Sequence, residues 1–260
     1  MNDGLLHVTY RRMRWLIPTI LITAINLPAA TLPNPLAQTR QLVVVSAPSW
    51  DSDTGTLMML SKVAGQWVRH SNEVPVVFGH GLAWGRGLQL NSKSGPQKRE
   101  GDQRSPAGIF FVGPVFGYAK NPPAGCRLPY CPITGRDYFV DDPNAKEYNQ
   151  WIKLPSGMNP KQRWRSAEKM LRPDALYQFG IVIRHNMDPI VKGAGSAIFF
   201  HVWRNAHTPT VGCTAMPRKD ILELIRWLDP GKKPLVIQAP AAELAKLRAQ
   251  VRTAGRDAQD

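Results

Sequence analysis

Short runs of β-branched and aromatic residues, each bounded by glycine, proline or polar turns, recur between residues 41 and 240 of this 260-residue chain. Runs of this length and composition are typical of β-strands. The 23 prolines and 21 glycines supply the turns that many short strands require. The pattern therefore predicts a mainly β fold, a sandwich or barrel, with one or two short capping helices.

The individual elements can be assigned from periodicity. The expected strands are residues 41–46, 56–61, 67–70, 74–78, 107–115, 180–185, 197–203 and 234–237. One short helix is expected over residues 164–171. A second is expected to open at Pro217, because apolar residues between positions 221 and 228 repeat at helical spacing. Residues 241–260 form a tail in which Leu244, Leu247 and Val251 share one helical face.

The N-terminus has the features of an export signal. Arg11, Arg12 and Arg14 precede an apolar stretch over residues 15–30, and alanines near its end offer a cleavage point. Two prolines interrupt the stretch, which is shorter than the roughly 20 residues that a membrane-spanning helix prefers. A cleaved signal over residues 1–37 is therefore favoured over a retained anchor that would tether the protein to a membrane. In both cases we expect the protein in the periplasm or cell envelope.

The chain is strongly basic, with 33 Lys and Arg against 19 Asp and Glu and a formal net charge of +14. Such a surplus favours anionic partners. No compact basic run, zinc-finger spacing or aromatic RNA-binding motif accompanies it, so no nucleic-acid partner is predicted. No internal repeat is present either, and we expect one domain over residues 41–240.

The three cysteines point to different roles. Cys126 and Cys131 lie five residues apart in a proline- and glycine-rich segment. In an exported protein a local disulfide between them is the natural interpretation. Cys213 then remains an unpaired thiol, and a reactive nucleophile is one explanation for it. A buried inert cysteine and a fully reduced protein are the alternatives.

The neighbours of Cys213 favour the nucleophile. Gly212 precedes it, and the expected helix follows at Pro217. Backbone N–H groups near a helix start are unpaired and carry partial positive charge, which favours a thiolate. The N–H groups around Gly212 and Thr214 could also receive the oxyanion of a tetrahedral intermediate. Gly212 lacks a Cβ and so allows a substrate carbonyl to approach.

A nucleophilic thiol also needs a base within reach. His201 ends an expected strand, and the turn-rich loop after it can bring it back to Cys213. His185 and His207 are rival bases. His201, His207 and Cys213 could also ligate zinc, but their spacing matches no compact zinc motif. No metal or organic cofactor is predicted.

Two segments then resemble the L,D-transpeptidases of the YkuD family. Residues 193–216, GAGSAIFFHVWRNAHTPTVGCTAM, are similar to the family's catalytic segment, in which a histidine on a strand precedes a Ser/Thr-x-Gly-Cys motif. His201 and Thr210–Cys213 occupy those positions. Residues 101–110, GDQRSPAGIF, resemble the family's upstream G-D-x-x-T/S-P-x-G-x-F signature. The resemblance covers roughly residues 41–240.

The resemblance implies a β-rich catalytic domain that acts on peptidoglycan stem peptides. Cys213 would attack the carbonyl of the third, diamino acid residue and expel the terminal D-Ala, with His201 as the base. The resulting thioester would pass to an amine of a second stem and form a 3→3 cross-link. No cofactor is implied.

The sequence departs from the family pattern beside the nucleophile. Many members carry an arginine two residues after the cysteine, whereas this chain has Ala215. Arg204 is the expected substitute charge for a substrate carboxylate, and Trp203 and Thr210 are further expected substrate contacts.

Three other functions remain open at this point. The thioester could pass to water, as in an L,D-carboxypeptidase. The chain could be a non-catalytic wall-binding protein, although both Cys213 and His201 are present. A metal-dependent hydrolase is the third alternative.

Overall fold

A run of three valines over residues 43–45 forms the centre of the first strand, and its side chains are buried on both faces. This strand, β1 (Gln41–Ala47), pairs in parallel with β14 (Leu235–Pro240) and antiparallel with β2 (Thr54–Val63). The structure, a computed structural model, describes residues 37–88 and 94–247. Strands buried on both faces require cover on both, and the rest of the fold supplies it.

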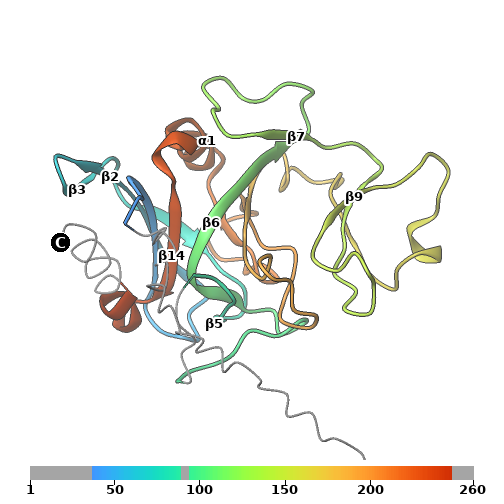
Figure 1. The fold of residues 1–260 in the computed structure, drawn as a ribbon, viewed down its shortest axis with the longest axis horizontal. Coiled ribbons are helices and arrows are strands. Elements are labelled where there is room, and N and C mark those ends of the chain that lie inside the picture. Colours follow the sequence, from blue (N-terminus) through green and yellow to red (C-terminus); the bar gives the residue numbers. More distant parts are fainter. Residues whose placement is uncertain (1–36, 89–93, 248–260) are drawn as a thin grey trace, which may run out of the picture. The chain divides into compact units, whose positions relative to one another are not determined.

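The remaining strands and helices range from two to 13 residues in length (Figure 1). The further strands of the main sheet are β3 (Gln66–Arg69), β4 (Val74–Val77), β5 (Leu82–Trp84), β6 (Ser105–Gly117), β7 (Tyr130–Pro132), β11 (Phe179–Ile183), β12 (Phe199–Val202) and β13 (Thr214–Met216). A small second sheet contains β8 (Asp137–Phe139), β9 (Trp151–Lys153) and β10 (Glu168–Lys169). The helical elements are α1 (Arg218–Trp227), the 3-10 turns η1 (Pro160–Gln162) and η2 (Pro230–Lys232), and a helical segment at residues 241–247.

The main sheet closes into a barrel. Its strand order is β1-β14-β6-β11-β12-β13-β4-β2-β3, and the additional pairing of β1 with β2 joins the two ends. Alternate side chains of these strands point inward and form the principal core, for example Phe200 and Val202 on β12 and Ile181 and Ile183 on β11. Closure fixes the register of every strand against its neighbours.

The strand directions define two ends of this barrel. β13 runs parallel to β12, and Cys213 immediately precedes β13. β1 and β14 run in the opposite direction, and Arg40 immediately precedes β1. Cys213 and Arg40 therefore lie at opposite ends, which we call the Cys213 end and the Arg40 end.

A second layer covers the outer face of β6, β11 and β12. Phe116, Val182 and Phe199 point outward from these strands and pack with Phe139 and Tyr177. The small sheet, ordered β10-β8-β9, carries Phe139 on β8. This aromatic layer supports one wall of the candidate site.

Most expected elements are confirmed, one is wrong, and several short strands of the structure were not expected. The expected helix over residues 164–171 is wrong, because Trp164 is buried in a turn and residues 168–169 form strand β10. The sequence did not predict strand β13 between Cys213 and the helix. The described part of the tail is helical with Leu244 and Leu247 buried, whereas Val251 and the signal segment over residues 1–36 lie outside the described residues.

The expected disulfide is not formed. Cys126 and Cys131 are both free thiols. They pack against different clusters, Cys126 against the barrel core and Cys131 against the outer aromatic layer. In the described part of the chain no helix is long and apolar enough to cross a bilayer.

Candidate active site

Cys213 lies at the mouth of the barrel, before strand β13 rather than at a helix start. Strand β13 separates it from α1, whose N-cap is Pro217. The helix-start argument for a stabilised thiolate is therefore wrong for this chain. Gly212 is required for a backbone reason, because its φ of +136° lies in a region that side chains with a Cβ rarely adopt.

Two hydroxyl groups fix the backbone of Cys213. Ser105 Oγ donates to the carbonyl of Cys213 at 2.8 Å, and Thr210 Oγ1 donates to the same carbonyl at 2.6 Å. Ser105 Oγ also accepts from the N–H of Gly79 at 2.9 Å. The upstream segment that carries Ser105 is thus hydrogen-bonded directly to Cys213 across the barrel end.

The sulfur atom of Cys213 is held in a neutral state. Its S–H donates to the carbonyl of Ala197 at 3.5 Å. Burial raises the pKa of Cys213 to about 12, and a backbone hydrogen bond from Phe199 opposes this shift only in part. The thiol is therefore protonated at neutral pH.

His201, the expected base, is also neutral. Its Nδ1 lies 2.8 Å from the carbonyl of Val202. A carbonyl can only accept, so Nδ1 carries the proton and Nε2 keeps the free lone pair. Burial lowers the pKa of His201 to about 4, so the imidazole is neutral at neutral pH.

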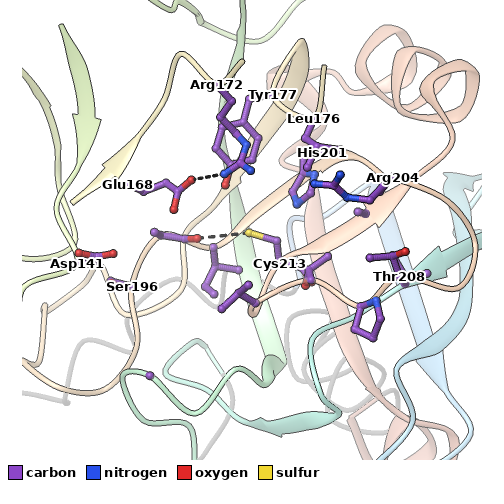
Figure 2. A pocket seen from close by; sticks show the side chains of 18 of the residues that line it. Asp141, Glu168, Arg172, Leu176, Tyr177, Ser196, His201, Arg204, Thr208 and Cys213 are labelled. Carbon is purple, nitrogen blue, oxygen red and sulfur yellow. Dashed lines mark hydrogen bonds and ion pairs between the residues drawn. The ribbon is translucent and has the colours of Figure 1, made fainter. Parts of the chain in front are cut away.

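Strand register brings these two residues together. His201 on β12 is the partner of Ala215 on β13, and Cys213 lies two residues before Ala215. Side chains two residues apart on a strand share one face, and the diagonal across neighbouring strands is about 8 Å between Cα atoms. His201 and Cys213 line one cavity of about 590 Å³ (Figure 2).

The cavity has walls of opposite charge. Glu100, Asp141 and Glu168 line it together with Arg172 and Arg204. Figure 2 shows Asp141 and Glu168 on one side of Cys213 and Arg204 on the side of His201. Burial and the nearby Glu100 raise the pKa of Asp141, with a hydrogen bond to Ser166 opposing them.

The acidic wall is anchored by neutral hydroxyls. The Tyr148 hydroxyl donates to Glu100 Oε2, and Ser196 Oγ donates to the same oxygen at 2.8 Å. Burial is the main reason that the pKa of Tyr148 is raised, and its bond to the Glu100 carboxylate adds to the effect. The Glu100 carboxylate is thus held at the cavity by donors that do not neutralise its charge.

The residues that support His201 had no sequence signal. Tyr177 packs edge-on against the imidazole with ring centroids 5.2 Å apart, and Arg172 lies 5.1 Å over the Tyr177 ring. Arg172 is itself held by Glu168 at 2.8 Å and by Asp174 at 3.0 Å. No motif marks these residues, and one of them, Glu168, falls in the segment expected to be a helix.

Of the other expected site residues, some line the cavity and others do not. Arg204 and Thr210 line the cavity, and Arg204 lies 3.6 Å from Asp174. Trp203 was expected to contact the substrate, but it does not line this cavity. It lines a separate groove with His70 and Pro217. The Thr214 hydroxyl is turned away to Gln238 at 2.8 Å.

Two further expectations concern the oxyanion and the rival bases. The N–H of Gly212 donates to Thr210 Oγ1 at 3.2 Å, so it would have to leave this bond to reach an oxyanion. His185 and His207 are not among the cavity-lining residues. No group of three or more potential metal ligands gathers anywhere in residues 37–88 and 94–247.

Comparison with known proteins gives a match to one family. The sequence model of YkuD, described as L,D-transpeptidase catalytic domain, matches residues 51–237. No match was found among curated protein sequences.

Two solved structures are also similar to this chain. Bd1075 of Bdellovibrio bacteriovorus is 12% identical, with a TM-score of 0.40 over 83% of this chain and 55% of that one. The helical cell shape determining protein Pgp2 of Campylobacter jejuni is 12% identical, with a TM-score of 0.35 over 78% of this chain and 48% of that one. The chain thus spans about half the length of these structures.

Proposed function

Because this chain belongs to the YkuD family of L,D-transpeptidase catalytic domains, we propose that it cross-links peptidoglycan through a thioester on Cys213. The donor in this proposal is a tetrapeptide stem, and the acceptor is the side-chain amine of a second stem. The product is a 3→3 cross-link. No cofactor takes part in these steps.

One observation carries the proposal. Cys213 and His201 share a strand face and a cavity, and the hydrogen bond of His201 to Val202 leaves Nε2 as the available base. A thiol and an unprotonated imidazole nitrogen facing one cavity are the minimum for acyl transfer by a cysteine enzyme. The match to the family model and this geometry are independent of each other.

The resting state determines how the first step proceeds. A neutral thiol and a neutral imidazole do not form an ion pair before the substrate binds. His201 Nε2 takes the thiol proton as the sulfur attacks the carbonyl of the third stem residue. The C–N bond to D-Ala then breaks, and the same proton is delivered to the departing amine.

The second half of the reaction uses the same two residues. The acceptor amine attacks the thioester carbonyl, and His201 Nε2 takes a proton from the attacking nitrogen. The C–S bond breaks, the proton returns to the Cys213 sulfur, and the enzyme is restored with one new amide bond. Gly212 and Thr214 remain the proposed backbone donors to the oxyanion.

The charged walls fit a substrate with groups of both signs. A diamino acid carries an ammonium group that suits the side of Asp141 and Glu100. Its carboxylate suits Arg204, which is exposed and the less committed of the two arginines. Ala215 leaves room beside His201 where many relatives have an arginine, and Arg204 is our proposed replacement.

We also propose the cellular setting and the domain limits. The sequence of residues 1–37 supports export to the periplasm or cell envelope, with either a cleaved signal or a membrane tether. The catalytic domain is proposed to cover residues 41–240, followed by a tail over residues 241–260.

The test is mass spectrometry of products from a purified disaccharide-tetrapeptide. We expect a dimer that has lost one D-Ala, and a covalent adduct of the protein at Cys213. Cys213→Ala should abolish both, with little change in stability, because only one sulfur atom is removed. Cys131→Ala is the matched control and should retain activity, since Cys131 lies outside the cavity.

Each other outcome contradicts a defined part of the proposal. Tripeptide without dimer would make the acceptor water and the protein an L,D-carboxypeptidase. Product formation by Cys213→Ala would reject the nucleophile. Absence of any Cys213-dependent product would reject peptidoglycan tetrapeptide as the donor.

A further inference from the structure

The Arg40 end of the barrel carries a rim of cationic side chains. Arg40 precedes β1, Lys62 lies near the end of β2, and Lys232 and Lys233 precede β14. The N–H of Lys62 donates to the carbonyl of Arg40 at 2.8 Å, and the N–H of Arg40 donates to the carbonyl of Lys232 at 2.9 Å. These bonds hold the three chain segments side by side, so the cations form one surface.

The charges of this rim are not compensated within the described residues. None of the four side chains makes an ion pair in residues 37–88 and 94–247. Lys233 Nζ contacts the side-chain oxygen of Gln38, and Lys62 Nζ lies 5.9 Å over a tryptophan ring. Asp229, the nearest carboxylate in sequence, pairs with Arg127 at 3.6 Å. Like charges that are held on neighbouring chain segments repel one another and attract an anionic surface.

An apolar hairpin adjoins the rim. β2 and β3 project from the barrel and are joined by a turn at Ala64 and Gly65 (Figure 1). Val63 is 57% exposed and Val68 is 49% exposed. Val68 pairs with Ser61, two residues before Val63, so both valines lie on one face of the hairpin. Lys62 pairs with Trp67 and therefore points to the opposite face, so the hairpin presents its exposed valines on one face and a cation on the other. Interfacial membrane-binding segments likewise combine an apolar face with Lys and Arg side chains.

We propose that this surface, the Arg40 rim with the tip of the β2–β3 hairpin, docks on anionic phospholipid. The cations contact the lipid phosphates, and Val63 and Val68 enter the headgroup region. In the alternative in which the N-terminal segment is retained as an anchor, position along the chain supports a lipid partner over another anionic surface. Residues 37–39 line the hollow between Arg40, Lys62 and Lys233, and only residues 31–36 separate it from the apolar stretch over residues 15–30.

The test compares two double variants of the full chain with the same change in net charge. Lys62→Glu with Lys232→Glu alters the rim. Lys146→Glu with Lys161→Glu is the control, since both lysines are exposed, outside any ion pair in the described residues and distant in the fold from the rim. Partition onto phosphatidylglycerol vesicles is measured relative to phosphatidylcholine vesicles. The N-terminal segment is present in every protein, so its contribution cancels.

We expect the rim variant to lose at least fivefold in the anionic-to-neutral partition ratio, and the control to lose less than twofold. Equal losses would reduce the effect to net charge and overturn the proposal. Hydrogen exchange of the unaltered chain on phosphatidylglycerol vesicles should protect residues 61–68. Binding without protection there would also overturn it, as would rim-dependent binding to isolated peptidoglycan without binding to vesicles.

Discussion

At the residue scale, buried neutral groups determine how the protein responds to pH. His201 is neutral because burial lowers its pKa to about 4, and His185 is neutral because burial lowers its pKa to about 3. The His185 ring is buried, and its Nε2 lies 3.0 Å from the carbonyl of Ala194. Neither ring can gain a proton in the folded state until the pH falls far below the ordinary histidine pKa near 6.5.

Acid should therefore destabilise the fold before its carboxylates protonate. Below a pH of about 6.5 the unfolded chain binds protons at positions 185 and 201, whereas the folded chain does not. The free energy of unfolding should thus fall as the pH falls, by up to about 1.4 kcal/mol per pH unit for each histidine. Urea unfolding between pH 7 and pH 5 measures this slope.

His185→Gln isolates the contribution of one ring. Glutamine can still donate to Ala194 but does not titrate, so the slope between pH 6.5 and pH 5 should fall by about half. An unchanged slope in this variant would show that His185 is not held neutral in the folded state. The absolute stability of the variant does not enter the comparison.

Residues with a chemical signature could be predicted from the sequence, and residues that act through packing could not. Cys213 and His201 stood out because an unpaired thiol, a neighbouring glycine and a strand-end histidine are visible in one short segment. Ser105 lay in a recognised motif, but its bond to a carbonyl 108 residues away depends on the barrel. Trp203 was misplaced because the side-chain alternation of β12 ends at Val202.

At the element scale, the close contact of β6 with β11 holds the aromatic layer behind the site. Gly180 on β11 faces Phe116 on β6, and a Cβ at Gly180 would lie 2.1 Å from the phenyl ring. The Phe116 ring also packs against Tyr177, which contacts His201. The absence of a side chain at Gly180 therefore determines how closely the aromatic layer packs against the barrel.

Gly180→Ala should destabilise the fold by about 1–3 kcal/mol through overpacking and should also lower activity, because Phe116 must move toward Tyr177. Gly135→Ala is the matched control, since its Cβ would have no neighbour nearer than 4.0 Å. Thermal unfolding and cross-linking rate measure the two effects. Equal behaviour of the two variants would contradict the role of this contact.

Strands with clear apolar runs were predicted well, and short strands made by tertiary pairing were not. β1, β6 and β12 are recognisable because many of their residues are β-branched or aromatic. β10 has only two residues, Glu168 and Lys169, whose strand conformation depends on pairing with β8. β13 was hidden because Thr214–Met216 has no periodicity of its own and becomes a strand between β12 and β4.

At the scale of the whole molecule, the two sheets should differ in local stability. The barrel surrounds a large continuous core, whereas the small sheet has its own cluster of only Val140, Leu154 and Trp164. Segments with few buried apolar contacts open locally at low free energy. The small sheet also supplies Glu168 to the cavity, so one wall can open while Cys213 stays fixed.

Hydrogen exchange should resolve this difference. We expect the amides of β1 and β14 to exchange most slowly, at the free energy of global unfolding, and those of β9 and β10 to exchange at least tenfold faster. Mass spectrometry of the exchanged peptides gives both rates in one experiment. Equal protection of the two sheets would indicate a single cooperative unit.

The length of the barrel strands fixes the distance between the Arg40 end and the Cys213 end. β1 has seven residues, which at about 3.3 Å each gives a strand about 20 Å long, and its tilt of roughly 40° in a barrel leaves about 15 Å along the axis between the Arg40 end and the Cys213 end. A closed ring of strands cannot slide in register, so this distance does not vary from one molecule to the next. On any flat surface that the Arg40 end touches, every copy would hold its thiol at the same level. All copies on that surface would then present their thiols at one distance from it, and an acceptor at another distance would have to move to that level.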